Sequence, residues 1–290
     1  MDATTAMYVA QGINGLAYGM ILFLIASGLT LIFGMMGILN LAHAAFFMLS
    51  AYLCYQVLAW TGSFWMALLI APVIGAVIGV LMERFMLRKV HAFGHIGELI
   101  LTVGVAMLIA DSVKWIWGTE NLPVRVPEIL QGLVTVGGLD YPIYRLFIIG
   151  LSLAILIFLM LILYKTRLGM VVRAAVSDAD MVDALGINVP FLFMLVFGVG
   201  TWMAGVAGVA ITPILTVFPG LADQVGMDAF IVVVVGGFGS LGGALLVAII
   251  CGLLNSYGVQ FVSQLAPVLM YIFMAIVLVF KPMGLFGERE

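Results

Sequence analysis

Three side chains with metal-binding chemistry lie close together between two apolar stretches. His91 and His95 are four residues apart and Glu98 follows three residues later, a spacing that suits zinc ligands on one face of a helix. Gly94 and Gly97 interrupt this stretch, and each glycine weakens a helix by about 1 kcal/mol relative to alanine. We therefore predict a cytoplasmic loop, with Glu98 near the N-terminus of the next helix, and keep a metal site as the alternative.

A glycine-rich stretch at residues 237–242 spells G-x-G-x-x-G. A dinucleotide site with this motif also needs an acidic residue about 20 positions further on, but the first acidic residue after Asp228 is Glu288. We therefore interpret these glycines as a helix break and expect no bound cofactor.

Other arrangements that are typical of enzymes are missing from the sequence. The chain lacks G-x-x-x-x-G-K-[ST], so we expect any ATP hydrolysis that drives it to take place on another chain. No Ser, His and Asp set and no pair of carboxylates lies well inside the apolar stretches, as nucleophilic or acid–base catalysis would need. We therefore expect a protein that is not an enzyme.

The chain that must position these residues is strongly apolar. Hydrophobic residues make up 65% of it and charged residues 9%, against about 45–50% and about 25% in soluble domains. This composition predicts an all-α polytopic membrane protein, and the even distribution of apolar stretches predicts a single transmembrane domain over residues 1–290. The first basic residue is Arg84, so we expect no cleaved signal peptide. The net charge of −3 gives no indication of nucleic-acid binding.

Eight apolar stretches are long enough to cross a bilayer, which takes about 20 residues of helix. They are residues 9–34, 41–60, 63–87, 96–117, 142–164, 191–213, 227–257 and 260–280. Eight of the eleven Lys and Arg residues follow the third, fifth or last stretch, and basic residues favour the cytoplasmic side. We therefore expect a cytoplasmic loop at residues 165–190 and extracytoplasmic loops at residues 118–141 and around Asp223 and Asp228.

The stretch at residues 227–257 is predicted to be broken. The basic C-terminal end can lie in the cytoplasm only if the chain crosses the membrane an even number of times after residue 190, and three stretches follow. A break among the five glycines of residues 236–243 restores the parity, with residues 227–236 as a descending half-helix and residues 241–257 as an ascending one. Such irregular backbone is tolerated in a membrane only where protein or a water-lined cavity covers it.

A second irregularity lies at residues 34–43, where two glycines, Asn40 and His43 separate two apolar stretches without any charge. Two interpretations remain open: a buried turn in which Asn40 and His43 satisfy loose carbonyl groups, or a lining of the translocation path, which polar residues inside membranes often mark. The two irregularities together give seven candidates for the path. These are Thr30, Asn40, His43, Gly236, Gly237, Gly239 and Ser240.

The polar stretch at residues 165–190 is predicted to contain a short helix at about residues 178–185. Residues 177–178 form an N-cap signal, Gly186 suits the position after the last turn, and Pro190 stands beyond it. The helix has an apolar face and an acidic face. These consist of Met181, Val182 and Leu185 and of Asp180 and Asp183. Two placements fit this pattern: in a groove of a partner protein or on the helix's own bundle.

Several motifs occur in one order over nearly the whole chain. They are G-L-T-L-I-F-G at 28–34, N-L-A-H at 40–43, E-R at 83–84, R-L-G at 167–169 with R-A at 173–174 and L-G-I-N at 185–188, A-G-V-A-G at 204–208, G-G-F-G-S at 236–240 with G-A at 243–244, and P-M-G-L-F-G at 282–287. In these motifs the chain resembles the permease subunits of ATP-binding-cassette importers of the branched-chain amino acid class.

The resemblance implies a subunit of the bacterial inner membrane that pairs with a second, related permease. It also implies two cytoplasmic ATPase subunits, a periplasmic substrate-binding protein and surrounding membrane lipid as partners. The loop at residues 165–190 would be the element that couples to the ATPase. Its candidate residues are Arg173, Asp178, Asp183, Leu185 and Gly186.

One departure from the family pattern leaves the substrate open. Ala44 stands where the family usually has glycine, and members of the family carry branched-chain or other hydrophobic amino acids, urea, short amides or small organic acids. Broken helices would also suit a self-sufficient secondary transporter or channel, although such proteins usually bury an ionisable residue. A structural membrane anchor is the third alternative.

Overall fold

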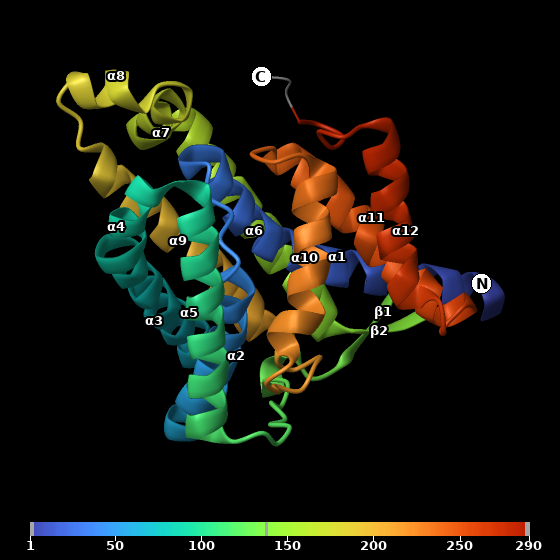
Figure 1. Ribbon diagram of the computed structural model, residues 1–290. Helices are drawn as coiled ribbons and strands as arrows, with labels where there is room; N and C mark the ends of the chain where they lie inside the picture. The colour runs from blue at the N-terminus through green and yellow to red at the C-terminus, as the bar shows by residue number, and fades with distance from the viewer. Residues whose placement is uncertain (1–2, 137–138, 288–290) are drawn as a thin grey trace.

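The computed structural model describes residues 3–136 and 139–287, and most of them are helical (Figure 1). The long helices are α1 (Ala3–Met36), α2 (His43–Thr61), α3 (Phe64–Met82), α5 (Gly94–Trp117), α6 (Ile143–Lys165), α9 (Val189–Ile211), α10 (Leu221–Gly236), α11 (Leu241–Phe261) and α12 (Ala266–Phe280). The shorter elements are the π-helix η1 (Glu83–Leu87), α4 (Arg88–Val90), the 3-10 helices η2 (His91–Phe93) and η3 (Glu128–Leu130), α7 (Arg167–Ser177), α8 (Ala179–Ala184), and the antiparallel strands β1 (Leu133–Val136) and β2 (Leu139–Pro142).

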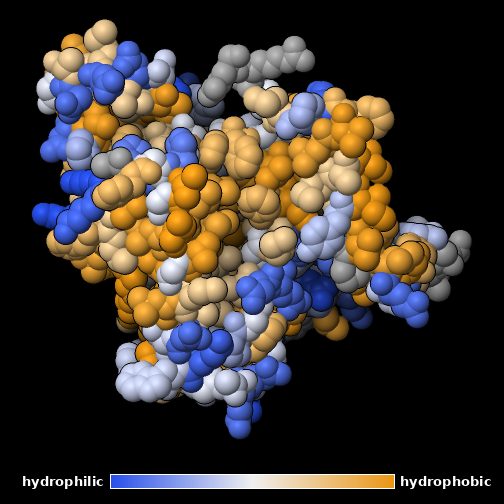
Figure 2. Space-filling view, in the orientation of Figure 1, coloured by the Kyte–Doolittle hydropathy of each residue, from blue (hydrophilic) through white to orange (hydrophobic). Residues whose placement is uncertain are grey.

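The prediction of an all-α polytopic membrane protein is confirmed. Within the described ranges, seven helices are long and apolar enough to cross a membrane, namely α1, α2, α3 with its continuation to Val90, α5, α6, α9 and α11. Helix α12 is a shorter apolar helix. Apolar side chains such as Leu69, Ile100, Ile157 and Val279 are exposed on the outside of the bundle, and Figure 2 shows a largely apolar surface between polar ends. These side chains form the lipid-facing surface.

Helix α1 forms the centre of the bundle. Residues 20–26 are all at most 1% exposed, so this part of the helix is covered on every side. Glycines let neighbouring backbones come into direct contact, as small residues do at membrane helix interfaces. A Cβ on Gly252 of α11 would overlap the carbonyl oxygen of Gly15, and one on Gly208 of α9 would overlap that of Phe47. Gly208 is thus a close-contact residue, as the A-G-V-A-G motif suggests.

The predicted helix break is present, but one boundary was wrong. Helix α10 ends at Gly236 and α11 begins at Leu241, which supplies the additional crossing that the distribution of basic residues required. Helix α10 begins at Leu221 rather than near residue 227. The polar Asp223 and Asp228 therefore lie within a helix and not in an outer loop. Asp228 is tolerated there because the hydroxyl of Tyr18 on α1 donates to its Oδ2 at 2.6 Å.

The bundle has two ends, which are called the cytoplasmic end and the outer end below, after the orientation that the basic residues predict. Figure 1 shows α7, α8 and the end of α12 at one end and the β1–β2 hairpin toward the other. The outer loops are joined by the bridge between Leu122 and Val217. Most of the basic residues lie at the cytoplasmic end, as the sequence predicts.

Candidate functional site

The segment at residues 165–190, called the coupling segment below after the role that the resemblance implies, contains two capped helices where one was predicted. The side chain of Thr166 accepts a hydrogen bond from the Gly169 amide and begins α7. Asp178 ends α7 and begins α8, since its Oδ1 accepts from the Met181 amide at 2.8 Å. Gly186 has a φ of 83°, which few residues except glycine adopt. The predicted helix and its caps are therefore present, and α7 was missed.

Helix α8 is attached to the bundle on one side only. Val182 is 4% exposed and packs inward, whereas Met181 is 58% and Leu185 is 73% exposed. Asp183 is also exposed. Val182 therefore fixes α8 on its own bundle, which is one of the two placements that the sequence left open. The remaining apolar and acidic side chains face away from the bundle, and their placement in a groove of a partner protein stays a prediction.

Arg173 does not belong to the exposed surface of α8. Its guanidinium lies 5.2 Å from the centre of the Tyr164 ring at the end of α6, a cation–π contact. Arg173 therefore holds α7 against α6.

Arg88 connects the coupling segment to the membrane helices. Its Nη2 donates to the carbonyl oxygen of Pro190 at 2.8 Å and to Oε2 of Glu83 at 3.4 Å. Glu83 is 2% exposed. The π-helix η1 lies between the two side chains and, with five residues rather than four per hydrogen-bonded turn, brings positions five apart together. The sequence reasoning missed Arg88 because ordinary helical spacing does not pair it with Glu83.

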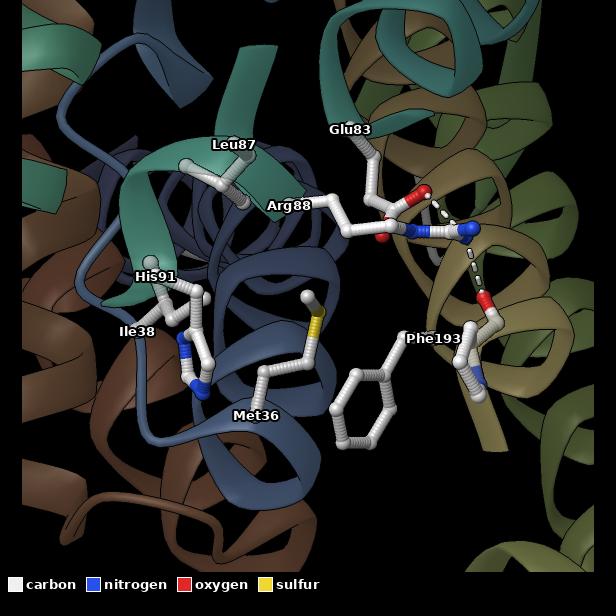
Figure 3. Close-up of a pocket in the computed structure, with 8 residues that line it drawn as sticks. Met36, Ile38, Glu83, Leu87, Arg88, His91 and Phe193 are labelled. Atoms are coloured by element: carbon white, nitrogen blue, oxygen red, sulfur yellow. Dashed lines mark hydrogen bonds and ion pairs between the residues drawn. The ribbon is translucent and has the colours of Figure 1, made fainter. Parts of the chain in front are cut away.

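A small cavity lies beside this connection. Its volume is about 150 Å³, and it is bounded by the end of α1, by η1 and α4, and by the start of α9. Figure 3 shows Arg88 and Glu83 on one side of it and Met36, Phe193 and His91 on another. The ends of α1 and η1 and the start of α9 are therefore not closely packed against one another at this point.

The predicted position of Glu98 near the start of a helix is confirmed, but the stretch before it is helical rather than a loop. His91 Nδ1 and His95 Nδ1 both pair with the Glu98 carboxylate, the latter at 3.3 Å. Glu98 is 2% exposed. No group of three His, Cys, Asp or Glu residues suited to a metal ion was found among the described residues. These contacts therefore stabilise the turn from α4 into α5.

Thr30, Asn40 and His43 are all buried and only partly hydrogen-bonded. Asn40 Oδ1 accepts from the Ala42 amide at 3.1 Å, and His43 Nε2 lies 3.0 Å from the carbonyl oxygen of Ile25. Thr30 Oγ1, Asn40 Nδ2 and His43 Nδ1 have no partner within the described ranges. Leaving such a buried group unpaired costs about 1–3 kcal/mol. The buried-turn interpretation thus accounts for two of these five polar atoms.

The link between α1 and α2 turns back into the bundle. His43, the first residue of α2, contacts Ile25 and Gly28, although α1 continues to Met36. At 1.5 Å per residue, the start of α2 therefore lies about 12 Å below the cytoplasmic end of α1. The two helix interruptions therefore lie at different distances from this end of the bundle. The link leads further into the bundle than the glycine break, where Gly239 lies against Gly34.

The glycine break lies at the cytoplasmic end, where other segments cover it. Gly237 has a φ of 97°, and a Cβ there would overlap Gly287. Ser240 begins α11 by accepting from the Gly243 amide at 3.1 Å. Gly239 lies against Gly34 of α1. Protein therefore covers the break at Gly236, Gly237 and Gly243, which are buried, whereas residues 238, 239 and 242 are exposed.

Comparison with known proteins shows which family this chain belongs to. The pattern of the family described as "Branched-chain amino acid transport system / permease component" matches residues 12–281. The chain belongs to this family. It is a permease subunit and a multi-pass protein of the inner membrane.

Relatives of the permease match over almost their full length. The high-affinity branched-chain amino acid transport system permease protein BraD of Pseudomonas aeruginosa is 28% identical, over 98% of this chain and 97% of the relative. The corresponding LivH protein of Escherichia coli is 29% identical, over 98% and 96%. A chain of PsaBC from Streptococcus pneumoniae, solved in complex with Fab, superimposes with a TM-score of 0.54 at 12% identity, over 94% of this chain and 92% of that one, and thus shares its fold.

The structure gives a reason for the departure at Ala44 of this permease. Ala44 is the second residue of α2 and faces Gly226 of α10. A Cβ on Gly226 would lie 2.5 Å from the Cβ of Ala44. The methyl group on α2 is thus accommodated by a glycine on α10. At this point α2 and α10 are therefore in contact through Ala44 and Gly226.

Proposed function

We propose that this permease carries branched-chain or other hydrophobic amino acids into the cell as part of an ATP-driven importer. Its partners in the proposal are a second, related permease, two cytoplasmic ATPase subunits and a periplasmic substrate-binding protein. Family membership and the names of the relatives support the substrate class. The ATPases would hydrolyse ATP, and this chain would supply the passage.

The observation that carries the proposal is the connection from α8 to the membrane helices. Met181, Leu185 and Asp183 face outward on α8, which suits an apolar groove with a basic rim on an ATPase. The segment ends at Pro190, whose carbonyl oxygen accepts from Arg88. A displacement of α8 would therefore be passed to α9 directly and to α3 through Arg88.

The seven path candidates fit a passage that is closed in this conformation. The buried side chains of Thr30, Asn40 and His43 keep unpaired polar atoms within the described ranges, which water or a solute would satisfy once the helices separate. Two states of a bundle that differ in this way provide the alternation that transport needs. The backbone carbonyls and the hydroxyl around Gly236, Gly237, Gly239 and Ser240 would form the cytoplasmic exit.

One observation favours a second candidate function, an ion-coupled secondary transporter. Asp228 lies within α10 and is hydrogen-bonded by Tyr18 on α1, and a carboxylate inside a membrane domain is typical of ion coupling. This alternative needs neither ATPase nor coupling segment.

Uptake by whole cells tests the proposal. The chain is expressed with the genes beside it in a strain that lacks its own branched-chain amino acid uptake, and entry of labelled leucine is measured together with co-purification of the other subunits. We expect leucine entry that unlabelled isoleucine and valine inhibit and urea, short amides and aromatic acids do not. Entry of one of the latter solutes, with leucine without effect, would contradict the proposed substrate.

A further inference from the structure

The outer half of the bundle contains a second cavity, which is distinct from all seven path candidates. Its volume is about 280 Å³, and it lies between the first part of α1, the start of α6, the end of α9, α10 and the last turns of α11. Helices of the outer end surround it, and Figure 2 shows polar surface gathered beside α10. A volume of this size suits a small molecule rather than a single water.

Three polar side chains line this cavity without partners in the part of the chain that the structure describes. They are Arg145 at the start of α6, Gln224 on α10 and Asn255 on α11. Arg145 is half-buried and offers a planar set of donors that matches a carboxylate. The neighbouring Asn14 is occupied, because its Oδ1 accepts from the Tyr141 hydroxyl at 2.7 Å. Burial raises the pKa of Tyr141 to about 12, so this hydroxyl keeps its proton and remains the donor.

An acidic group lies behind the wall of the cavity. Tyr18 lines the cavity and donates to Asp228, which follows Gln224 by one helical turn on α10. Asp228 is not itself a lining residue, so its negative charge acts on the cavity from behind Tyr18. Carboxylate and amide oxygens are suitable acceptors for an ammonium group.

Most of the remaining wall of the cavity is aliphatic. It consists of Ile21, Ile211, Ile214, Leu215 and Val259, together with the polar Gln11 and Ser256, which are hydrogen-bonded to each other. One small space therefore combines a cation, free amides and a branched aliphatic surface, with an anion behind its wall. This combination matches the carboxylate, the ammonium group and the branched side chain of one kind of molecule.

We infer that this outer cavity binds the transported amino acid, with Arg145 on its carboxylate, the amide oxygens of Gln224 and Asn255 on its ammonium group, and the aliphatic wall on its side chain. The inference rests on the proposed function and adds a site to it. The Asp228 carboxylate, held behind Tyr18, would favour the ammonium group through its charge and would not couple an ion. The cavity would receive the amino acid from outside before the deeper polar residues are exposed.

Leucine entry into cells that carry the whole transporter tests the site. We expect Arg145→Ala to lower the rate of entry by about tenfold or more, the loss typical of a charged hydrogen bond, and Arg145→Lys to restore part of it. Arg125→Ala is the matched control, because Arg125 is exposed in an outer loop and does not line the cavity. Co-purification of the other subunits shows whether each variant assembles.

Protection from labelling supplies a readout that a structural role of Arg145 would not produce. Ser256→Cys, at a lining position without a proposed contact to the substrate, is treated on whole cells with a maleimide that does not cross membranes, while the natural Cys54 and Cys251 are buried. We expect leucine to slow the labelling of this variant, and urea to leave it unchanged. If Arg145→Ala fails to assemble, this labelling measurement still shows whether leucine binds in the outer cavity.

The outcomes separate the two claims. If the unaltered transporter moves leucine, but Arg145→Ala equals Arg125→Ala or leucine leaves labelling unchanged, the site is wrong and the proposed function stands. If the unaltered transporter moves no amino acid, the proposed function fails and this site fails with it.

Discussion

At the scale of single residues, Arg88 is the side chain that connects the coupling segment to the membrane helices. It is the donor that joins Pro190, at the end of the coupling segment, to the buried carboxylate of Glu83. Its removal leaves a buried acceptor without this partner, which costs about 1–3 kcal/mol. The bundle has many other contacts, so this loss should affect the transmission of movement before it affects folding.

We therefore expect Arg88→Ala to lower leucine entry by about tenfold while ATPase subunits still co-purify and hydrolyse ATP. The reason is that α8 stays docked while its displacement no longer reaches α3. Lys89→Ala is the control, because Lys89 is exposed beside Arg88. Uptake and ATP hydrolysis measured on the same preparation check the prediction, and equal uptake by the two variants would contradict it.

The contact between Ala44 and Gly226 gives a second prediction. Gly226→Ala would bring two methyl groups to 2.5 Å, and overpacking of this kind typically costs about 1–3 kcal/mol. We expect a lower thermal unfolding temperature for Gly226→Ala, and recovery in the double variant with Ala44→Gly. Thermal unfolding of the purified protein measures both, and an unstable double variant would show that Gly226 is needed for another reason.

Sequence reasoning reached some of these residues and not others, for physical reasons. Asp178 and Gly186 were found because a cap and a left-handed turn are encoded locally. The pair of Glu83 and Arg88 was not, because it depends on a π-helical turn. Asp228 was placed in a loop because its partner, Tyr18, is 210 positions away.

At the scale of elements, α8 is the helix whose docking the account requires. Gly186 has a φ of 83°, whereas proline fixes φ near −65°, so Gly186→Pro must rebuild the end of α8. Asp183→Lys reverses a charge on its exposed side. Neither change touches the membrane helices.

We expect both variants to insert normally but to lose leucine entry and ATPase co-purification. Glu120→Lys is the matched charge reversal, since Glu120 is exposed on the outer side. Normal recovery of the ATPase with Asp183→Lys and Gly186→Pro would count against docking through α8.

The sequence predicted the existence of these elements better than their boundaries. The break at Gly236 followed from glycine content and from the parity of crossings. Helix α7 was missed because polar cytoplasmic helices lack the long apolar signal of a span. The start of α10 was misplaced because Asp223 and Asp228 are polar and suggested a loop. In the structure, the hydrogen bond from Tyr18 stabilises Asp228 within the helix.

At the scale of the whole molecule, the sequence predicts an orientation, because basic residues favour the cytoplasmic side of a membrane. The arrangement of the helices was not predictable, since direct backbone contacts such as Gly208 with Phe47 and Gly252 with Gly15 join distant parts of the chain. The result is a bundle with a coupling segment at one end and a polar cavity at the other. Such an arrangement suits a passage that is driven from the cytoplasm.

Reconstitution in liposomes is the most direct test of whether this permease works only as part of an ATP-driven importer. The chain alone, and the chain with its permease partner, ATPases and binding protein, are compared for leucine uptake with ATP, without ATP, and under an ion gradient. We predict uptake by the complete assembly only, and only with ATP. Uptake by the chain alone under an ion gradient would contradict the account and favour the secondary transporter.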